Sequence, residues 1–532
     1  YGDHRDLHLS IRRQRQMCIR DRSGSDAMKH SVSGCLLAAV LLTACVRADN
    51  PIDIGSRREL FVDNHILNHM DGVRLKLHTP QDAGKAFVLD RPWEGFGGYP
   101  TVIHYGGKFQ LFYRGKTGLT NAGNPDETTC YAESTDGIHW SRPNLRLFKV
   151  HGTRKNNVIL DNTFAPVCHN FAPFVDTRPG VPANQRYKAL GGTFPVEWRK
   201  EPDSGGLMAL VSPDGIHWKY LATKPVIDKS LHPARNCDTC QSSVFWSQHE
   251  QCYVCYVRVW KNFGKERLRP GFTGDTRWIG RTTSPDFINW KPIRFMEYTP
   301  DAFPDQLYLP NTQPYVRAPH IYVAVTARLS DHRLVITPEQ AKALSVPKDA
   351  WRDTSDAIFM TSRGGFRYDR PFMSSFLRPG PGSQNWVTRC TFPVQGIVQT
   401  GPNELSFYVE RDNAQPTEHI RRYTLRLDGF ASVHAPYQGG EASTRSLRFQ
   451  GSRLRINFAT SAAGWIRCEV QDASGNPNPG IELRNCREMA GDHIDRTVTW
   501  RTSSDLSRIS GQTVRLRFVM KDADLYALQF SK

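Results

Sequence analysis

One short turn motif recurs along the chain, and this recurrence limits the fold more than any other feature. The first copy reads Y-A-E-S-T-D-G-I-H-W at 131–140, and L-V-S-P-D-G-I-H-W follows at 210–218. The third copy is R-T-T-S-P-D-F-I-N-W at 281–290, with a looser echo at 359–371. In the close copies the Asp can accept backbone N–H groups of a hairpin turn, and Gly supplies positive φ in the first two. Hairpins that return at intervals of roughly 70 to 80 residues indicate a repeat architecture.

The segments around these turns form five similar sets of β-prone runs. A four-stranded sheet buries neither face alone, so radial packing of the sheets is the expected solution. We therefore predict an all-β chain with a five-bladed β-propeller at 51–440, in which 59–78 supplies the last blade's outer strand or a clamp. An irregular array of β-sandwiches is the alternative. The runs are 99–114 and 145–150 with the first turn, 170–176 and 186–190 with the second, 242–246 and 252–260 with the third, 312–316 and 321–328 with the echo, and then 390–399, 404–410 and 421–430.

The composition changes after Gly439 and Gly440, where alternating strand-like segments continue to the end of the chain. A stretch of about ninety residues of this kind has the size of a β-sandwich. We expect 441–532 to form a second domain of that type.

Residues 1–48 are expected to lie outside the folded domains. Residues 1–27 show no periodicity, and we interpret them as a non-native leader. Residues 28–48 fit a signal peptide, and L-T-A-C before Val46 resembles a bacterial lipoprotein box with lipidation of Cys45. Cleavage after Ala48 is the alternative. Both readings predict export, either as an outer-membrane or cell-surface lipoprotein held by its lipid anchor or as a periplasmic protein.

The net charge of +17 suits an anionic partner. The basic residues are scattered and no Lys/Arg block with interleaved aromatics stands out, so we expect no nucleic-acid partner. No P-loop or dinucleotide-binding glycine pattern occurs. We expect a monomer with a carbohydrate substrate.

Acidic residues near the start of each blade's first strand are the catalytic candidates. Inner strands of a propeller start at one end of a central channel, where two carboxylates from different blades can face each other across a sugar. The candidates are Asp90 and Glu94 in the first blade, Asp238 in the third and Asp305 in the fourth. The turn residues Asp136, Asp214 and Asp286 are expected to cap their turns instead.

Polar and aromatic residues at the same places are the substrate-binding candidates, since sugars stack on rings and hydrogen-bond to polar groups. They are Trp93, Tyr99, His169, Asn170, Tyr308, Arg389 and Gln395.

The cysteines allow several readings. Cys237-x-x-Cys240 and Cys252-x-x-Cys255 approach zinc-ribbon spacing. Three residues apart on a strand, however, Cys252 and Cys255 point to opposite faces, and export favours disulfides. We therefore expect no metal ligands there; a disulfide in this region or buried free thiols remain open, as does a Cys468–Cys486 pair. Calcium in the channel also remains open.

The repeated sheets, the S-x-D-G-x-x-W turns and the C-terminal sandwich resemble the five-bladed propeller glycosidases of glycoside hydrolase families 43, 32 and 130. Families 43 and 32 place an Asp in blade one, an Asp in blade two and a Glu in blade three. This sequence departs from that pattern, with His169 and Asn170 in blade two and Asp238 in blade three.

The resemblance implies an exported glycoside hydrolase that cleaves an acidic or neutral polysaccharide or oligosaccharide with two carboxylates in the channel. A cell-surface glycan-binding lipoprotein without activity is the alternative. The turn is also similar to the sialidase Asp box. A sialidase-like hydrolase would use a Tyr nucleophile and converging arginines, for which Tyr308, Arg114, Arg258, Arg328 and Arg389 are available.

Overall fold

The computed structural model describes most of the chain after its leader. The described residues are 50–94, 98–115, 127–192, 205–232, 240–262, 275–299, 305–347, 350–501 and 503–532. The proposed leader, the signal peptide and Cys45 lie outside them, as does Asp238. The described part is almost entirely β, with one short α-helix, α1 (Pro338–Ala343). Among the described residues, none of the helices is both long and apolar enough to cross a membrane.

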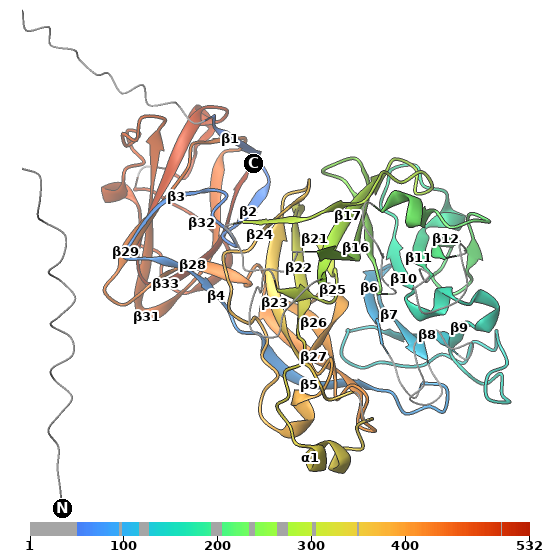
Figure 1. Cartoon of the computed structure of the whole chain (residues 1–532). Coiled ribbons are helices and arrows are strands. Elements are labelled where there is room, and N and C mark those ends of the chain that lie inside the picture. Colours follow the sequence, from blue (N-terminus) through green and yellow to red (C-terminus); the bar gives the residue numbers. More distant parts are fainter. Residues whose placement is uncertain are drawn as a thin grey trace, which may run out of the picture. The chain divides into compact units, whose positions relative to one another are not determined.

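Five blades, each with four main strands that pair antiparallel, form a ring (Figure 1). The innermost strands of the five blades contact one another in sequence around the ring, and the last contacts the first, which closes it. The innermost strands of the first and fifth blades also pair with each other, in parallel, so these two blades form one eight-stranded sheet. The fold is therefore a five-bladed β-propeller, as predicted. From the innermost strand outward, the blades are β6 (Thr101–Tyr105), β7 (Lys108–Gly115), β8 (Thr128–Ser134) and β9 (Val158–Leu160); β10 (Ala172–Val175), β11 (Tyr187–Gly191), β12 (Gly206–Ser212) and β13 (Lys219–Tyr220); β15 (Ser243–Ser247), β16 (Cys252–Asn262), β17 (Asp275–Ser284) and β18 (Arg294–Phe295); β21 (Thr312–Tyr315), β22 (Ala318–Ser330), β23 (Thr354–Ser362) and β24 (Arg367–Asp369); and β25 (Phe392–Gly401), β26 (Glu404–Arg411), β27 (His419–Arg426) and β5 (Gln81–Val88).

Short strands extend two of these blades. In the second blade, β14 (Ile227–Asp228) pairs with β12, and in the fourth, β19 (Glu297–Thr299) pairs with β24 and β20 (Gln306–Leu307) with β22. The outer strand of the fifth blade is β5, which comes from the N-terminal side of the propeller and pairs antiparallel with β27. This pairing holds the two ends of the ring together.

The recurrent turn has the predicted geometry. Asp136 Oδ1 accepts the backbone N–H groups of Ile138 and His139, each at 2.8 Å, and Gly137 has φ 74°. The same bonds recur at Asp214 and Asp286, and the indoles of Trp218 and Trp290 fold back, are buried and donate to a turn carbonyl. These aspartates therefore cap turns, as expected.

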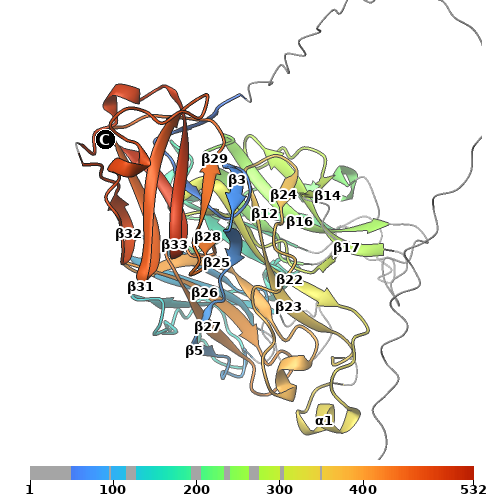
Figure 2. The same ribbon diagram turned by 90° about the vertical axis from the view of Figure 1, so that its left-hand side faces the viewer.

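The C-terminal domain is a β-sandwich with a core of its own. Its two longest strands, β31 (Arg453–Asp472) and β33 (Thr513–Ser531), lie side by side (Figure 2) and pair antiparallel. The other strands of this domain are β1 (Ile52–Gly55), β2 (Arg58–Leu60), β3 (Leu67–Asp71), β4 (Arg74–Leu77), β28 (Ala431–Ala435), β29 (Gly440–Thr444), β30 (Leu447–Phe449) and β32 (Asp492–Thr497).

The division of the chain differs from the expected boundaries. Strands β1 to β4 pair with β30, β33, β29 and β28 of the C-terminal domain rather than with the propeller. The blade strands therefore begin at Gln81, and the sandwich is built from both ends of the described chain. The segment 59–78 belongs to it, whereas the closing strand that we expected from this segment is β5.

The described cysteines are free thiols. Cys468 and Cys486 lie next to each other in the sandwich, where the Cys468 N–H donates to Cys486 Sγ at 3.2 Å. Cys255 is buried on β16, whereas Cys252 is partly exposed. Cys237 lies outside the described residues, and among those residues there is no group of three or more side chains that could hold a metal ion.

Candidate active site at the upper mouth of the channel

The five innermost strands begin at one end of the channel, which we call the upper mouth, and finish at the other, the lower mouth. Tyr99 precedes β6, His169 and Asn170 precede β10, and Tyr308 and Arg389 precede β21 and β25. Each second strand runs antiparallel to the first, so it returns to the upper mouth and brings Arg114, Arg258 and Glu410 with it. Side chains from all blades can therefore meet there.

The backbone at the upper mouth is unusual at two of these places. Tyr99 has φ 52° and Arg389 has φ 56°, in the left-handed region that residues other than glycine seldom adopt. Strained conformations of this kind are held by their surroundings and gather at functional sites. Both residues immediately precede an innermost strand.

Arginine side chains lie over the two tyrosine rings. The guanidinium carbon of Arg114 lies 5.2 Å from the centre of the Tyr99 ring, and that of Arg258 lies 4.2 Å from the centre of the Tyr308 ring. The guanidinium carbon of Arg277 is 5.4 Å from the same Tyr308 ring. All three contacts are cation–π interactions, which position cations on aromatic faces.

These charges change the acidity of Tyr308. Its burial raises the pKa of the phenol, but Arg258, Arg389 and Arg277 favour the phenolate and together bring the pKa below its ordinary value. Burial dominates at Tyr99, whose pKa is raised well above the ordinary value. The two tyrosines thus differ in acidity because the charge of Tyr308 raises the pKa of Tyr99 and because more arginines act on Tyr308.

A carboxylate and an imidazole lie on the side of blades one and two. Nδ1 of His169 is 2.9 Å from Glu127 Oε2 and 3.1 Å from Arg114 Nη1, and Arg114 Nη1 is 3.8 Å from Glu127 Oε1. Glu127 immediately precedes β8, and all three side chains are almost completely buried. Arg114 therefore links this carboxylate to Tyr99.

Two glutamates lie together on the side of blade five. Asn413 Nδ2 donates to Glu410 Oε1 at 3.2 Å and to Glu418 Oε1 at 3.4 Å. Both glutamates are buried, with exposed fractions of 1% and 3%. Burial, a hydrogen bond with Glu410 and the negative charge of Glu410 raise the pKa of Glu418 well above its ordinary value. The Glu418 carboxyl group therefore keeps its proton to a higher pH than an ordinary glutamic acid does.

Arg389 connects the glutamates to the tyrosines. Burial lowers its pKa, but Tyr308, Tyr99, Glu410 and Glu418 all favour its charged form and outweigh burial, so that the pKa is raised. We call the whole group the upper-mouth cluster. Its members are Tyr99, Arg114, Glu127, His169, Arg258, Arg277, Tyr308, Arg389, Glu410 and Glu418.

The acidic candidates from the sequence lie elsewhere or outside the described residues. Glu94 is fully buried, accepts a 2.5 Å hydrogen bond from Tyr113 Oη and forms an ion pair of 2.7 Å with Arg142 Nε. Tyr113 and Arg142 both pack on Phe87 of β5, so Glu94 stabilises the junction between blades one and five. We therefore assign Glu94 a structural role.

Two further acids are held in ion pairs. Asp305 contacts Arg370 Nη2 at 2.5 Å and Arg328 Nη1 at 3.4 Å. Asp90 is exposed and lies 3.5 Å from Arg91 and 3.4 Å from Arg142. Arg328 also pairs with Asp356, so it is not a member of the upper-mouth cluster. Asp238 lies outside the described residues.

The binding candidates divide between the cluster and other places. Tyr99, His169, Tyr308 and Arg389 belong to the cluster. Asn170 joins blades two and three, since its Nδ2 donates to Cys240 O at 3.3 Å. Trp93 donates from Nε1 to Asn157 Oδ1 at 2.9 Å within blade one, and Gln395 lines a cavity at the lower mouth.

Sequence reasoning missed Glu127, Glu410 and Glu418. The prediction considered only acidic residues at or before the first strand of each blade. Glu127 and Glu418 precede third strands, and Glu410 is near the end of a second strand. The stretch E-R-D-N-A-Q-P-T-E at 410–418 offered a signal, because it concentrates polar residues between two expected strands of the fifth blade.

No protein-family model matches the chain, and no curated protein matches its sequence. Several solved structures are similar in fold. A glycoside hydrolase family 43 arabinoxylan arabinofuranohydrolase from Bacillus subtilis, in complex with cellotetraose, has 12% identity and a TM-score of 0.38 over 83% of this chain and 96% of its own.

Two others cover less of the chain. A structure described with the GH130 family of mannoside phosphorylases, which contains glycoside hydrolases that target β-1,2 mannosidic linkages in Candida mannan, has 14% identity and a TM-score of 0.38 over 65% of this chain and 94% of its own. A glycosyl hydrolase from Bacteroides ovatus has 14% identity and a TM-score of 0.37 over 68% and 96%. These similarities concern the fold, which the strand topology establishes by itself.

Proposed function

We propose that the protein is a glycoside hydrolase whose reaction takes place at the upper mouth. The observation that carries the proposal is the convergence there of a glutamic acid with a raised pKa, a second carboxylate, arginines and tyrosines from different blades. Glycosidic bond cleavage needs a proton donor for the leaving oxygen and a second group that supplies a base or nucleophile. The upper-mouth cluster holds groups of both kinds.

Glu418 is the proposed proton donor. Burial and a hydrogen bond with Glu410 raise the pKa of this carboxyl group, so it keeps its proton to a higher pH than an ordinary glutamic acid does. A carboxylic acid with a raised pKa is the form that a general acid requires. Glu127, beside Arg114 and His169, is the proposed carboxylate that acts as base or nucleophile.

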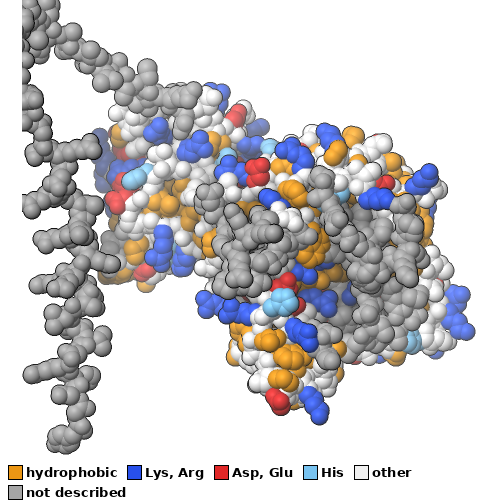
Figure 3. Space-filling model, in the orientation of Figure 1, with side chains coloured by type: hydrophobic (Ala, Val, Ile, Leu, Met, Phe, Trp, Pro, Cys, Tyr) orange, Lys and Arg blue, Asp and Glu red, His pale blue; other side chains and the backbone are white. Residues whose placement is uncertain are grey.

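The arginines favour a substrate with a negative charge. Arg258, Arg277 and Arg389 all act on Tyr308, and Arg114 lies over Tyr99. Arginine binds carboxylate and sulfate groups through paired N–H donors, so we propose a uronic or sulfated saccharide. The chain has a net charge of +17, and Lys and Arg side chains are spread over the face shown in Figure 3. Both observations agree with an anionic polymer as the substrate.

The test is a screen of the mature chain against neutral, uronic and sulfated glycans, with detection of new reducing ends. We expect turnover of a uronic or sulfated glycan and a loss on the order of 10² to 10⁴-fold in Glu418→Gln. Glu488→Gln, at an exposed position in the sandwich, is the matched control. Full activity in Glu418→Gln would remove this residue from the mechanism. Binding without turnover in the parent chain would favour the glycan-binding alternative.

A sialidase-like hydrolase is a second candidate, favoured by the lowered pKa of Tyr308 among three arginines. Tyr308 would then be the nucleophile and Arg258, Arg277 and Arg389 would bind the substrate carboxylate. The discriminating measurement is hydrolysis of a 4-methylumbelliferyl sialoside by the parent chain and by Tyr308→Phe. Turnover that survives in Tyr308→Phe would exclude this mechanism.

We also propose that the protein is exported and that Cys45 is lipidated. The support is the leader sequence at 28–48. Mass spectrometry of the mature N-terminus, expressed from Met28 in a bacterium with a lipoprotein pathway, distinguishes a diacylated Cys45 from a chain that starts after Ala48.

A further inference from the structure

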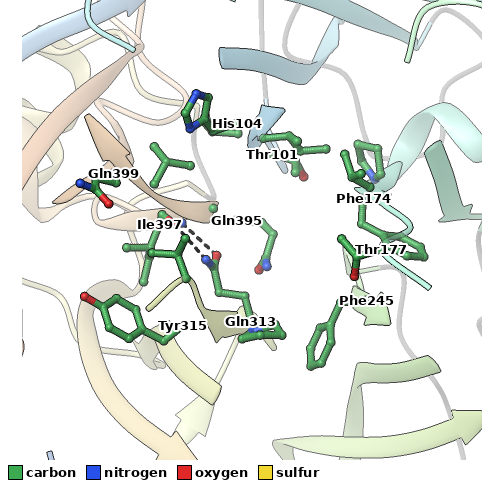
Figure 4. Close-up of a pocket in the computed structure, with 18 of the residues that line it drawn as sticks. Thr101, His104, Phe174, Thr177, Phe245, Gln313, Tyr315, Gln395, Ile397 and Gln399 are labelled. Carbon is green, nitrogen blue, oxygen red and sulfur yellow. Dashed lines mark hydrogen bonds between the residues drawn. The ribbon is translucent and has the colours of Figure 1, made fainter. Parts of the chain in front are cut away.

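The lower mouth holds a cavity that the proposed reaction does not use. Its volume is about 830 Å³, and residues from the innermost strands of all five blades line it (Figure 4). Sites for small molecules are usually concave, mostly apolar and of roughly 300 to 1,000 Å³. The cavity is therefore large enough for a small organic molecule.

The walls of the cavity are mostly apolar, with threonine, serine, glutamine and histidine side chains among the apolar ones. Ile103, Phe174, Phe245, Val316 and Ile397 contribute to them, one from each blade. Among the described residues that line the cavity there is no Asp, Glu, Lys or Arg. A charged ligand would lose its hydration there without an opposite charge in return, so the cavity selects against ions of either sign.

Two of the glutamines that line this cavity, Gln313 and Gln395, differ in their hydrogen bonds. Gln313 is fully paired, because its Nε2 donates to Ile397 O at 3.0 Å and its Oε1 accepts the Ile397 N–H at 2.9 Å. Gln395 is only half paired: its Nε2 donates to Thr312 O at 3.4 Å, whereas its Oε1 accepts no hydrogen bond from the described residues. Oε1 has almost no accessible surface, so a ligand in the cavity reaches it when the Gln395 amide group turns toward the cavity. Figure 4 shows the Gln395 side chain pointing into the hollow between Gln313 and Thr101.

We propose that the lower mouth binds a neutral aromatic alcohol, whose ring packs between the apolar walls and whose hydroxyl donates a hydrogen bond to Gln395 Oε1. A buried acceptor without a partner costs free energy that a donor from a ligand recovers. The rings of Phe174 and Phe245 offer faces for stacking or edge contacts.

The buried side chain of Gln241 lies between this site and the upper-mouth cluster. Gln241 Nε2 donates to the carbonyl oxygens of Tyr99 and Phe171, at 2.6 and 2.9 Å, and to Thr101 Oγ1 at 2.9 Å. The proposal therefore stands apart from the proposed hydrolase reaction, and either can fail without the other.

The first experiment compares three probes by calorimetry with the unaltered mature chain. We expect 2-naphthol to bind about tenfold or more tightly than 2-methoxynaphthalene, which lacks the donor, since one hydrogen bond to a buried acceptor has about that effect. We expect 2-naphthoate, which is anionic, to bind most weakly. Equal binding of the first two probes, stronger binding of the anion or no binding of any probe would overturn the proposal.

Two variants locate the site. Gln395→Leu replaces the amide with an apolar side chain and should remove the preference for 2-naphthol over 2-methoxynaphthalene. Val316→Asp, at a position that is 57% exposed and tolerates a polar group, should weaken both neutral probes, whereas Leu334→Asp, at a position that is 60% exposed and does not line the cavity, should not. Unchanged probe binding in both variants would place the probe elsewhere.

A second copy of the chain is the competing occupant. Sedimentation of the parent chain and of Val316→Asp tests it, because the proposal expects a monomer in both at the probe concentrations. Self-association that Val316→Asp abolishes would assign the lower mouth to a protein interface and overturn the small-molecule proposal.

Discussion

The two mouths of one channel differ in chemistry although the same five strands build both. At the upper mouth, charged side chains and tyrosines from several blades converge, whereas the described residues that line the lower cavity are mostly apolar, with uncharged polar side chains and one histidine among them. The connections explain the difference. At the lower mouth β6 and β7 are joined by Gly106 and Gly107 alone, both with positive φ, while at the upper mouth the chain from β7 to β8 runs from Gly115 to Thr128. Long connections leave space in which several polar side chains can converge, whereas tight hairpins do not.

The largest expected effect concerns the wall of the lower mouth. Phe245 is buried, and its ring packs edge-on against Tyr322 at 5.1 Å. Phe245→Ala leaves a void and is expected to lower the free energy of unfolding by about 3–5 kcal/mol. Denaturant titration measures this loss. If the mouths are separate, kcat on the best glycan stays within about twofold of the parent at a temperature where the variant is folded; a large fall in kcat would show that they are coupled.

The second prediction alters the acidity of the upper mouth. Glu410→Gln removes the negative charge that helps to raise the pKa of Glu418. A general acid works in its protonated form, so activity falls as the pH rises through its pKa. In Glu410→Gln we expect this fall at a lower pH and a loss of about 10²-fold in kcat near neutral pH. The pH profile of kcat is the measurement; a profile that does not move would contradict the role of the pair.

The third prediction concerns the arginines. Arg258→Gln removes the guanidinium over Tyr308, so the pKa of Tyr308 should rise, because one of the charges that favour the phenolate is gone. We expect kcat/KM for an anionic glycan to fall by about tenfold and that for a neutral one to change less. Ultraviolet difference titration and paired kinetics test both expectations. An equal loss on both substrates would argue against charge recognition.

The smallest effect is expected at the turns that rim the lower mouth. Asp136→Ala removes the acceptor for two turn N–H groups, next to Thr135 in the cavity wall. Each such hydrogen bond contributes about 1 kcal/mol, so a loss of about 1–2 kcal/mol in unfolding free energy is expected with unchanged kcat. Asp214→Ala is the matched comparison in the second blade, and a difference of more than about 2 kcal/mol between the two would show that the turns are not equivalent.

The blades were predictable because their signal is local. Ser134, Asp136 and the following turn lie within a few residues, and their copies at 212 and 284 give the spacing of the sheets. The origin of the sandwich strands was not predictable in this way. Strand β2 pairs with Leu528 and its neighbours, and no short-range pattern reports a partner so distant in sequence.

The candidate site was predictable only in part for the same reason. Tyr308 and Arg389 were found because they precede inner strands, a position that the repeat itself defines. Glu94 and Asp305 satisfied the same rule, but Arg142 and Arg370 neutralise them, and those pairings depend on packing between distant segments. Glu418 was missed because its raised pKa comes from burial beside Glu410, which composition alone does not reveal.

The closing strand β5 has a consequence for synthesis. Residues 81–88 emerge from the ribosome early and must wait for 419–426 before the circle can be completed, and strands β1 to β4 wait longer still for β28 to β33. Contacts of such long range make folding slow. The nascent polypeptide therefore exposes unpaired edges until residues 513–531 have been synthesised, which makes protection by a holding chaperone during translation a physical need.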